Sequence, residues 1–367
     1  MPDGAVPPDR RAAARPGRPR RGWTSWVPRI VVAAVMIGLL FGYGIPQVVG
    51  AGYGEVFAEV GRVEPVMLAV MIATWAASLW IYVFALTACL PGLTHPQGQV
   101  LNLAGSAVSN VVPFGGALGV GATYTIGRSW GFSSTTISVE VAVTGLYNFL
   151  TKLALPVVAL AGLALQARAN PSLVAAAATG LVVFVVTVGL LVVVERSEES
   201  AVRIGAWAQR ATDRALTLLR ARRRFDVAGA VVRFRAETFH VLRDEWSQLT
   251  AALLGFKMAQ LALLWLCVTA VGRSPALGVL DVFAAYAFGR ILSAVPITPG
   301  GVGFVETGSI AALVALGGDP VGSAAAVLLF SGFIYLLEIP VGALAWVVWA
   351  AASGWRRDEP RLPAPSS

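Results

Sequence analysis

Six ionisable side chains interrupt otherwise apolar stretches of the chain, and their charges could bind or titrate with a ligand. The cations are Lys152, Lys257 and Arg290. The chain has 28 Lys and Arg residues, and Lys152 and Lys257 are its only lysines. A lysine inside a membrane costs roughly 2.5–3.5 kcal/mol on insertion scales, so each needs a partner or a polar cavity. The candidate counter-ions or proton-coupling groups are the carboxylates Glu140, Glu306 and Glu338.

These charges support two interpretations. They are either structural ion pairs that hold a helix bundle together, or the lining of a cavity that receives a negatively charged headgroup. Lys257 and Gln260 share one helical face. A polar stripe at helical spacing lies beside Lys152 and consists of Glu140, Thr144, Tyr147, Asn148 and Thr151.

Two Pro- and Gly-rich centres break apolar runs where membrane helices would continue. They read "NVVPFGGALGVG" (110–121) and "AVPITPGGVGFVE" (294–306). Each predicts a helix start inside the membrane, whose unpaired N–H groups and positive dipole end can hold a phosphate. The headgroup candidates from these centres are Asn110, Pro113, Gly115, Gly116, Pro299, Gly300, Gly301 and Gly303. Glu306 then serves either as a helix cap or as a titrating group.

Composition indicates that helices in a membrane must position these residues. Hydrophobic residues make up 56% of the chain, charged residues 13%, and the mean hydropathy is +0.71. These values predict an all-α, polytopic membrane protein. About six full spans are expected at 27–46, 66–90, 136–166, 172–194, 247–271 and 321–352, and two broken runs at 100–127 and 281–317.

Arginine counts predict the orientation. Residues 1–29 carry seven arginines and 195–246 carry eleven, whereas 47–65, 167–171 and 272–280 carry one each. The positive-inside rule therefore places both termini in the cytoplasm. The expected organisation is a disordered basic tail (1–26), a transmembrane domain (27–352) with an amphipathic cytoplasmic connector (195–246), and a cytoplasmic tail (353–367).

The number of spans between the two broken runs predicts opposite orientations for them. The first opens from the cytoplasm and the second from outside, so they read as re-entrant hairpins in inverted repeats, a pattern typical of transporter sites at mid-membrane. The alternative is two ordinary pairs of short helices that pack through glycine surfaces.

Several kinds of chemistry lack a sequence signal. His95 and His240 have no metal-ligand neighbours at plausible spacing, so no metal site and no cofactor are expected. There is no phosphate-binding P-loop and no nucleic-acid module, despite the pI of about 10.1. Cys89 and Cys267 are predicted near opposite membrane faces and should not form a disulfide.

The second broken run, "LSAVPITPGGVGFVETGSIAALVALG" (292–317), resembles the signature of the lysylphosphatidylglycerol synthase transmembrane region, a flippase-like family. The first, followed by "YTIGRSWG" (124–131), is similar to the family's earlier motif, although Phe114, Gly115 and Gly116 stand where many members carry charges. The resemblance implies a protein that moves or accommodates lipids with charged or sugar-bearing headgroups. Full synthases also carry a soluble aminoacyl-transfer domain, and the 52-residue connector is too small to be one, so no enzyme activity is expected.

The leading hypothesis is a lipid translocase of the bacterial inner membrane that binds an anionic or modified headgroup. Its expected partners are membrane lipids, a second copy of the chain or an envelope-lipid biosynthetic enzyme. One rival is a secondary transporter of a small anion or drug, coupled to protons through Glu306 or Glu140. Another is a non-catalytic membrane subunit of an envelope-lipid-modifying complex.

Overall fold

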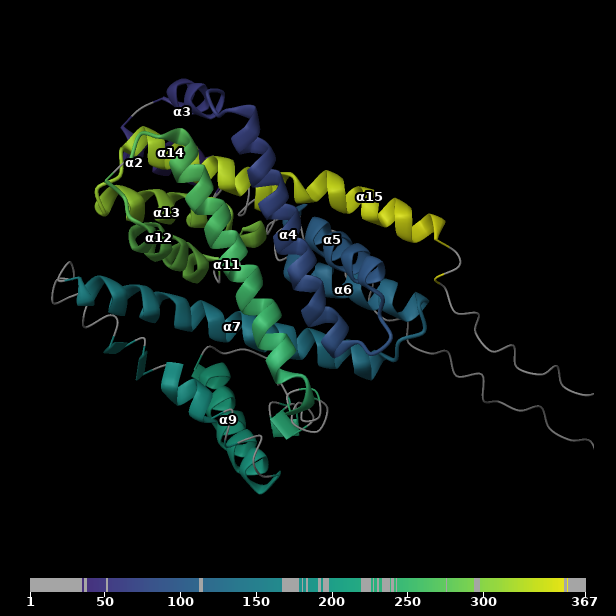
Figure 1. Ribbon diagram of the computed structural model, residues 1–367. Coiled ribbons are helices and arrows are strands. Elements are labelled where there is room, and N and C mark those ends of the chain that lie inside the picture. Colours follow the sequence, from purple (N-terminus) through teal and green to yellow (C-terminus); the bar gives the residue numbers. More distant parts are fainter. Residues whose placement is uncertain are drawn as a thin grey trace, which may run out of the picture.

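The computed structural model is helical throughout the residues that it describes (Figure 1). These are residues 38–50, 52–111, 115–166, 198–218, 243–274, 276–293 and 298–352, with shorter pieces at 35, within 178–193, within 226–241 and at 355. The predicted tails, 1–26 and 353–367, lie almost entirely outside these ranges. The same holds for much of the predicted spans 27–46 and 172–194.

Among the residues that the structure describes, four helices are long and apolar enough to cross a membrane, and each coincides with a predicted span. They are α4 (Pro65–Cys89), α7 (Ser134–Leu165), α11 (Trp246–Val271) and a bent helix over Pro320–Ala351. The bent helix consists of α14 (Pro320–Ser331), a π-helical turn η4 (Gly332–Leu336) and α15 (Glu338–Ala351). The all-α, polytopic membrane architecture predicted from composition is confirmed.

Each broken run forms two short helices around its Pro- and Gly-rich centre. The first run gives α5 (His95–Val111) and α6 (Gly115–Ser129). The second gives α12 (Val279–Leu292), a 3₁₀ turn η3 (Pro299–Gly301) and α13 (Phe304–Ala315). Smaller elements are η2 (Leu40–Gly44), α2 (Ile45–Val49) and α3 (Tyr53–Val60) near the amino terminus, and α9 (Glu198–Leu218) in the connector.

The two halves of the bundle contact each other in a reciprocal way. The first half comprises α4 to α7 and the second comprises α11 to α15, and α4 packs along α11 between them (Figure 1). The last helix of each half packs against the first hairpin helix of the other half, α7 against α12 and α15 against α5. Helices from both halves therefore surround each hairpin.

Small residues let the two helices of each hairpin approach closely. A Cβ atom on Gly115 would lie 2.2 Å from the carbonyl oxygen of Ser109, and one on Gly119 would lie 2.1 Å from the Ser109 Oγ atom. In the second hairpin, a Cβ atom on Gly289 would lie 2.4 Å from the Ser309 Oγ atom. Close glycine packing of this kind is the geometry that the alternative interpretation of the hairpins requires.

Gly115 and Gly116 should respond differently to alanine. Gly115→Ala forces a methyl group against backbone, so we expect the free energy of unfolding to fall by roughly 1–3 kcal/mol. Gly116 is the matched control because a Cβ atom there meets nothing within 4 Å. Thermal unfolding of both purified variants would measure the difference. Equal melting temperatures would contradict the close approach at Gly115.

Arg273 connects three segments outside the long helices. Its guanidinium contacts the Glu59 carboxylate of α3 at 2.8 Å and the Asp319 carboxylate, which caps α14, at 3.0 Å. The hydrogen bond to Glu59 and the charge of Asp319 raise the pKa of Arg273 above its ordinary value. Because this cluster is partly exposed, it orders the connections between helices more than it stabilises the bundle.

Candidate functional site

The three predicted cations come from three different helices and lie close enough together to interact electrostatically. Lys152 is on α7, Lys257 on α11 and Arg290 on α12. The charges of Arg290 and Lys152 both act on Lys257. Only 5% of Lys257 and 8% of Arg290 is exposed, and Lys152 is half-buried. The packing of α7 against α12, across the two halves, brings this cluster together.

None of the three cations has a carboxylate within salt-bridge distance in the described part of the chain. The ion pairs found there, each within 4.0 Å, involve Arg62, Arg203 and Arg273. Arg290 lies 5.2 Å from the centre of the Tyr286 ring and beside Tyr335, and its Nε atom has no hydrogen-bond partner there. The cluster therefore carries positive charge that no carboxylate of the described protein neutralises at ion-pair distance, and the Arg290 Nε donor is unused.

Glu306 acts as the cap of α13. Its Oε2 atom accepts a hydrogen bond from the Gly303 backbone N–H at 2.5 Å, and its Oε1 atom accepts one from the Ser331 hydroxyl at 2.8 Å. The side chain is 1% exposed, and its charge reaches Arg290. The structure thus contains the helix cap, which was one of the two roles that the sequence offered for Glu306. A phosphate at this helix start would compete with Glu306 for the Gly303 N–H group.

The glycines after Pro299 make the tight turn that the sequence predicted. Gly300, Gly301 and Gly303 have φ angles of 59°, 81° and 91°, a region that favours glycine. The Tyr335 hydroxyl donates a hydrogen bond to the Gly300 carbonyl oxygen at 2.9 Å. The π-helical turn thereby fixes the tip of the second hairpin to the bent helix.

The tip of the first hairpin also contacts the second half. The Asn110 amide nitrogen lies 3.4 Å from the Glu338 Oε2 atom and 3.4 Å from the Ile334 carbonyl oxygen. Glu338 is therefore a neighbour of Asn110 and not an ion-pair partner of the three cations. Pro113 lies outside the described residues, and Gly115 is explained by its close approach to Ser109.

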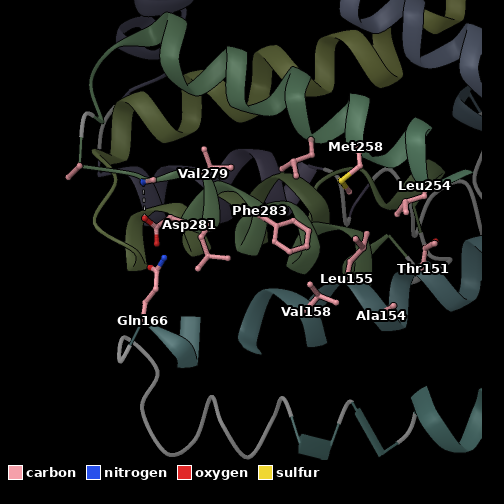
Figure 2. Close-up of a pocket in the computed structure, with 14 residues that line it drawn as sticks. Thr151, Ala154, Leu155, Val158, Gln166, Leu254, Met258, Val279, Asp281 and Phe283 are labelled. Carbon is pink, nitrogen blue, oxygen red and sulfur yellow. Dashed lines mark hydrogen bonds between the residues drawn. The ribbon is translucent and has the colours of Figure 1, made fainter. Parts of the chain in front are cut away.

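An apolar groove of about 930 Å³ runs along α7, α11 and α12, the helices that carry the cations (Figure 2). Leu155, Val158, Met258 and Phe283 line its middle, and Gln166 and Asp281 lie at one end. The other end lies near Thr151 and Leu254. Val158 and Leu254 are among the exposed apolar residues of the chain, so the groove opens to the surroundings of the bundle.

The three cations lie on the helices that form this groove, although none of them is among its lining residues. Lys152 directly follows Thr151 on α7, and Lys257 precedes Met258 on α11. On α12, Arg290 lies about two turns beyond Phe283, away from the Asp281 end. The apolar groove and the cation cluster therefore share three helices.

Sequence reasoning did not find Tyr286, Tyr335 or Ser331, although each contacts a predicted site residue. Tyr335 is 35 residues from its partner Gly300, and Ser331 is 25 residues from Glu306. Neither is charged, and no local pattern distinguishes them from the apolar residues around them. In the residues that the structure describes, no group of His, Cys, Asp and Glu side chains is suited to a metal ion.

The comparisons with known proteins identify one family. The family model described as the lysylphosphatidylglycerol synthase transmembrane region matches residues 26–342. The match includes both hairpins, the three cations and the groove. No curated protein matches the chain.

Proposed function

Because the chain belongs to the lysylphosphatidylglycerol synthase transmembrane-region family, we propose that it binds an anionic membrane lipid and moves it between leaflets without a catalytic step. The proposed location is the bacterial inner membrane, with both termini in the cytoplasm. In this proposal the lipid phosphate contacts Lys152, Lys257 and Arg290, and an acyl chain occupies the apolar groove.

The observation that carries the proposal is a cluster of buried cations without carboxylate partners. A buried charge left unpaired is costly, so two such groups beside the half-buried Lys152 favour a ligand that brings the missing negative charge. Structural ion pairs would place a carboxylate within about 4 Å of these nitrogens. Glu140, Glu306 and Glu338 do not form such pairs in the described chain.

The groove supports a lipid over a small soluble anion. Its wall is mostly aliphatic and aromatic (Figure 2), and it is formed by the same three helices that carry the cations. Burial of apolar surface stabilises a bound chain by roughly 25 cal/mol per Å², which a small anion cannot exploit. A phospholipid matches both regions at once, with its phosphate at the cations and its chain in the groove.

Native mass spectrometry of the full chain after gentle extraction tests this proposal. We expect retained phospholipids with anionic headgroups, and preferential rebinding of phosphatidylglycerol over phosphatidylcholine when both are added. Binding should weaken as the salt concentration rises, because part of it is electrostatic. Equal binding of both lipids would contradict the headgroup assignment. Uptake of a soluble anion without lipid binding would favour a secondary transporter instead.

Movement between leaflets needs its own measurement. Vesicles that contain the purified chain should exchange labelled phosphatidylglycerol between leaflets faster than protein-free vesicles do. Lipid binding without faster exchange would contradict lipid movement. It would favour a lipid-binding membrane subunit instead, such as one that serves an envelope-lipid enzyme.

A further inference from the structure

A second cavity, of about 410 Å³, lies between α5, α6 and α7 in the first half of the bundle. Its wall is polar, unlike that of the groove. The lining side chains that carry oxygen include Asn102, Ser106, Thr123, Glu140, Thr144 and Asn148, and no lysine or arginine lines it. Glu140 is the only charged side chain among the lining residues, and the lining residue Asn110 contacts a second carboxylate, Glu338, at 3.4 Å.

Glu140 is the charged group of this cavity and lacks a counter-charge among the described residues. It is 4% exposed, and its Oε2 atom is buried there without a hydrogen-bond partner. Its Oε1 atom lies 3.3 Å from the Thr144 hydroxyl, which also donates to the Glu140 backbone carbonyl oxygen at 2.8 Å. An ionised carboxylate can accept about four hydrogen bonds. The carboxylate thus has unused capacity to bind a cation.

Two of the neighbouring side chains use a donor within their own helices. Thr123 donates its hydroxyl proton to the Gly119 carbonyl oxygen at 3.2 Å, and Asn148 donates from its amide nitrogen to the Thr144 carbonyl oxygen at 2.9 Å. Each of these two side chains keeps an oxygen atom that can coordinate a cation, while the second amide N–H group of Asn148 and the Tyr82 hydroxyl remain as donors in the wall. Oxygen atoms around one carboxylate repel a phosphate and suit a hard cation.

We propose that this cavity binds a small monovalent cation, as Na⁺ or as a primary ammonium ion, with Glu140 as its counter-charge. The volume accommodates the ion together with several water molecules, each of which takes about 30 Å³. A single carboxylate neutralises one positive charge, which favours a monovalent ion over a divalent one. The experiment distinguishes whether the bound cation is an inorganic ion or an amine.

This site is separate from the proposed phosphate site. Glu140 and Lys152 are twelve residues apart on α7, which corresponds to about 18 Å along the helix. The two sites also differ in the sign of their charge. One can therefore fail while the other stands, and a cation bound here would couple an ion gradient to the helix that both sites share.

Thermal unfolding of the full chain in non-ionic detergent tests the cation site at constant ionic strength. We expect NaCl or methylammonium chloride to raise the melting temperature by at least about 2 °C relative to N-methylglucamine chloride, whose cation is bulky. The salt that acts identifies the source of the charge. Glu140→Gln should abolish the difference, whereas the exposed control Glu64→Gln and the phosphate-site variant Lys257→Met should keep it.

If the Glu140→Gln variant fails to fold, a second measurement on the unaltered protein tests the same site. A hydrophobic carbodiimide should modify Glu140 of the unaltered protein, and the effective cation should slow that modification, as read by peptide mass spectrometry. Identical unfolding in all three salts together with unprotected modification would overturn the proposal and leave a protonated structural carboxyl group. A salt effect that persists in Glu140→Gln would also overturn it.

Discussion

Lys257→Met should weaken binding of phosphatidylglycerol by about 10- to 100-fold and leave the lipid-free protein at least as stable as before. A hydrogen bond to a charged group contributes roughly 1.5–3 kcal/mol, and 1.4 kcal/mol corresponds to a factor of ten in affinity. Methionine keeps the apolar stem of a residue that is 5% exposed, and it removes an ammonium group that has no carboxylate partner in the described chain. The substitution should thus lower the affinity for phosphatidylglycerol while the stability of the lipid-free protein stays the same or rises.

The measurement combines native mass spectrometry titrations with thermal unfolding for Lys257→Met, Lys152→Met and the double variant. Lys152 is half-buried, so its single substitution should have the smaller effect of the two. Arg62→Met is the matched control, because it also removes one positive charge but its side chain is 72% exposed. Unchanged affinity in the double variant would refute the headgroup role. Loss of folding in both single variants would instead support structural ion pairs.

The helical elements of the bundle were predictable because their physical cause is local. A run such as Pro65–Cys89 is apolar on all sides, and nothing but a membrane span or a buried core accommodates it. The breaks at Pro299 and Gly300 were predictable for the same reason, since proline and glycine act on their own backbone. The positions of the paired short helices, α5 with α6 and α12 with α13, followed from these breaks.

The identity of the site residues was only partly predictable, because their environment is set by contacts between the two halves. The sequence indicated that Lys257 and Arg290 lie within apolar helices. It offered Glu140, Glu306 and Glu338 as their counter-ions, and no local pattern could exclude those pairings. The cap of α13 by Glu306 was one of the two roles that the sequence offered, whereas only the packing shows that Glu338 meets Asn110.

The groove and the polar cavity had no sequence signal of their own. The groove needs α7 from the first half beside α11 and α12 from the second. The cavity depends on which face of α7 meets α5 and α6, and a one-residue rotation of that helix would direct Glu140 elsewhere. A polar stripe on α7 was predicted, but the sequence alone could not assign Glu140 and Lys152 to different sites.

Cysteines at the two hairpin tips should react from opposite sides of the membrane. The arginine counts and the number of spans between the hairpins predict that the first tip faces the cytoplasm and the second faces outside. The reciprocal packing of α7 with α12 and α15 with α5 supports two related halves. Ala117→Cys and Val302→Cys report on the tips in a background that lacks Cys89 and Cys267, which are both buried.

An impermeant thiol reagent, applied to spheroplasts and to inverted vesicles, provides the measurement. Ala117 is exposed and Val302 is half-buried, so the informative quantity is the ratio of outside to inside rates at each position. We expect this ratio to exceed one for Val302→Cys and to fall below one for Ala117→Cys. Arg203→Cys is the control for the side of the connector, because this residue is exposed on α9, which the arginine counts predict to be cytoplasmic. Alternating access would bring both rate ratios closer to one, but each would stay on its own side of one. Preferential labelling of both tips from the same side would therefore refute the inverted-repeat architecture.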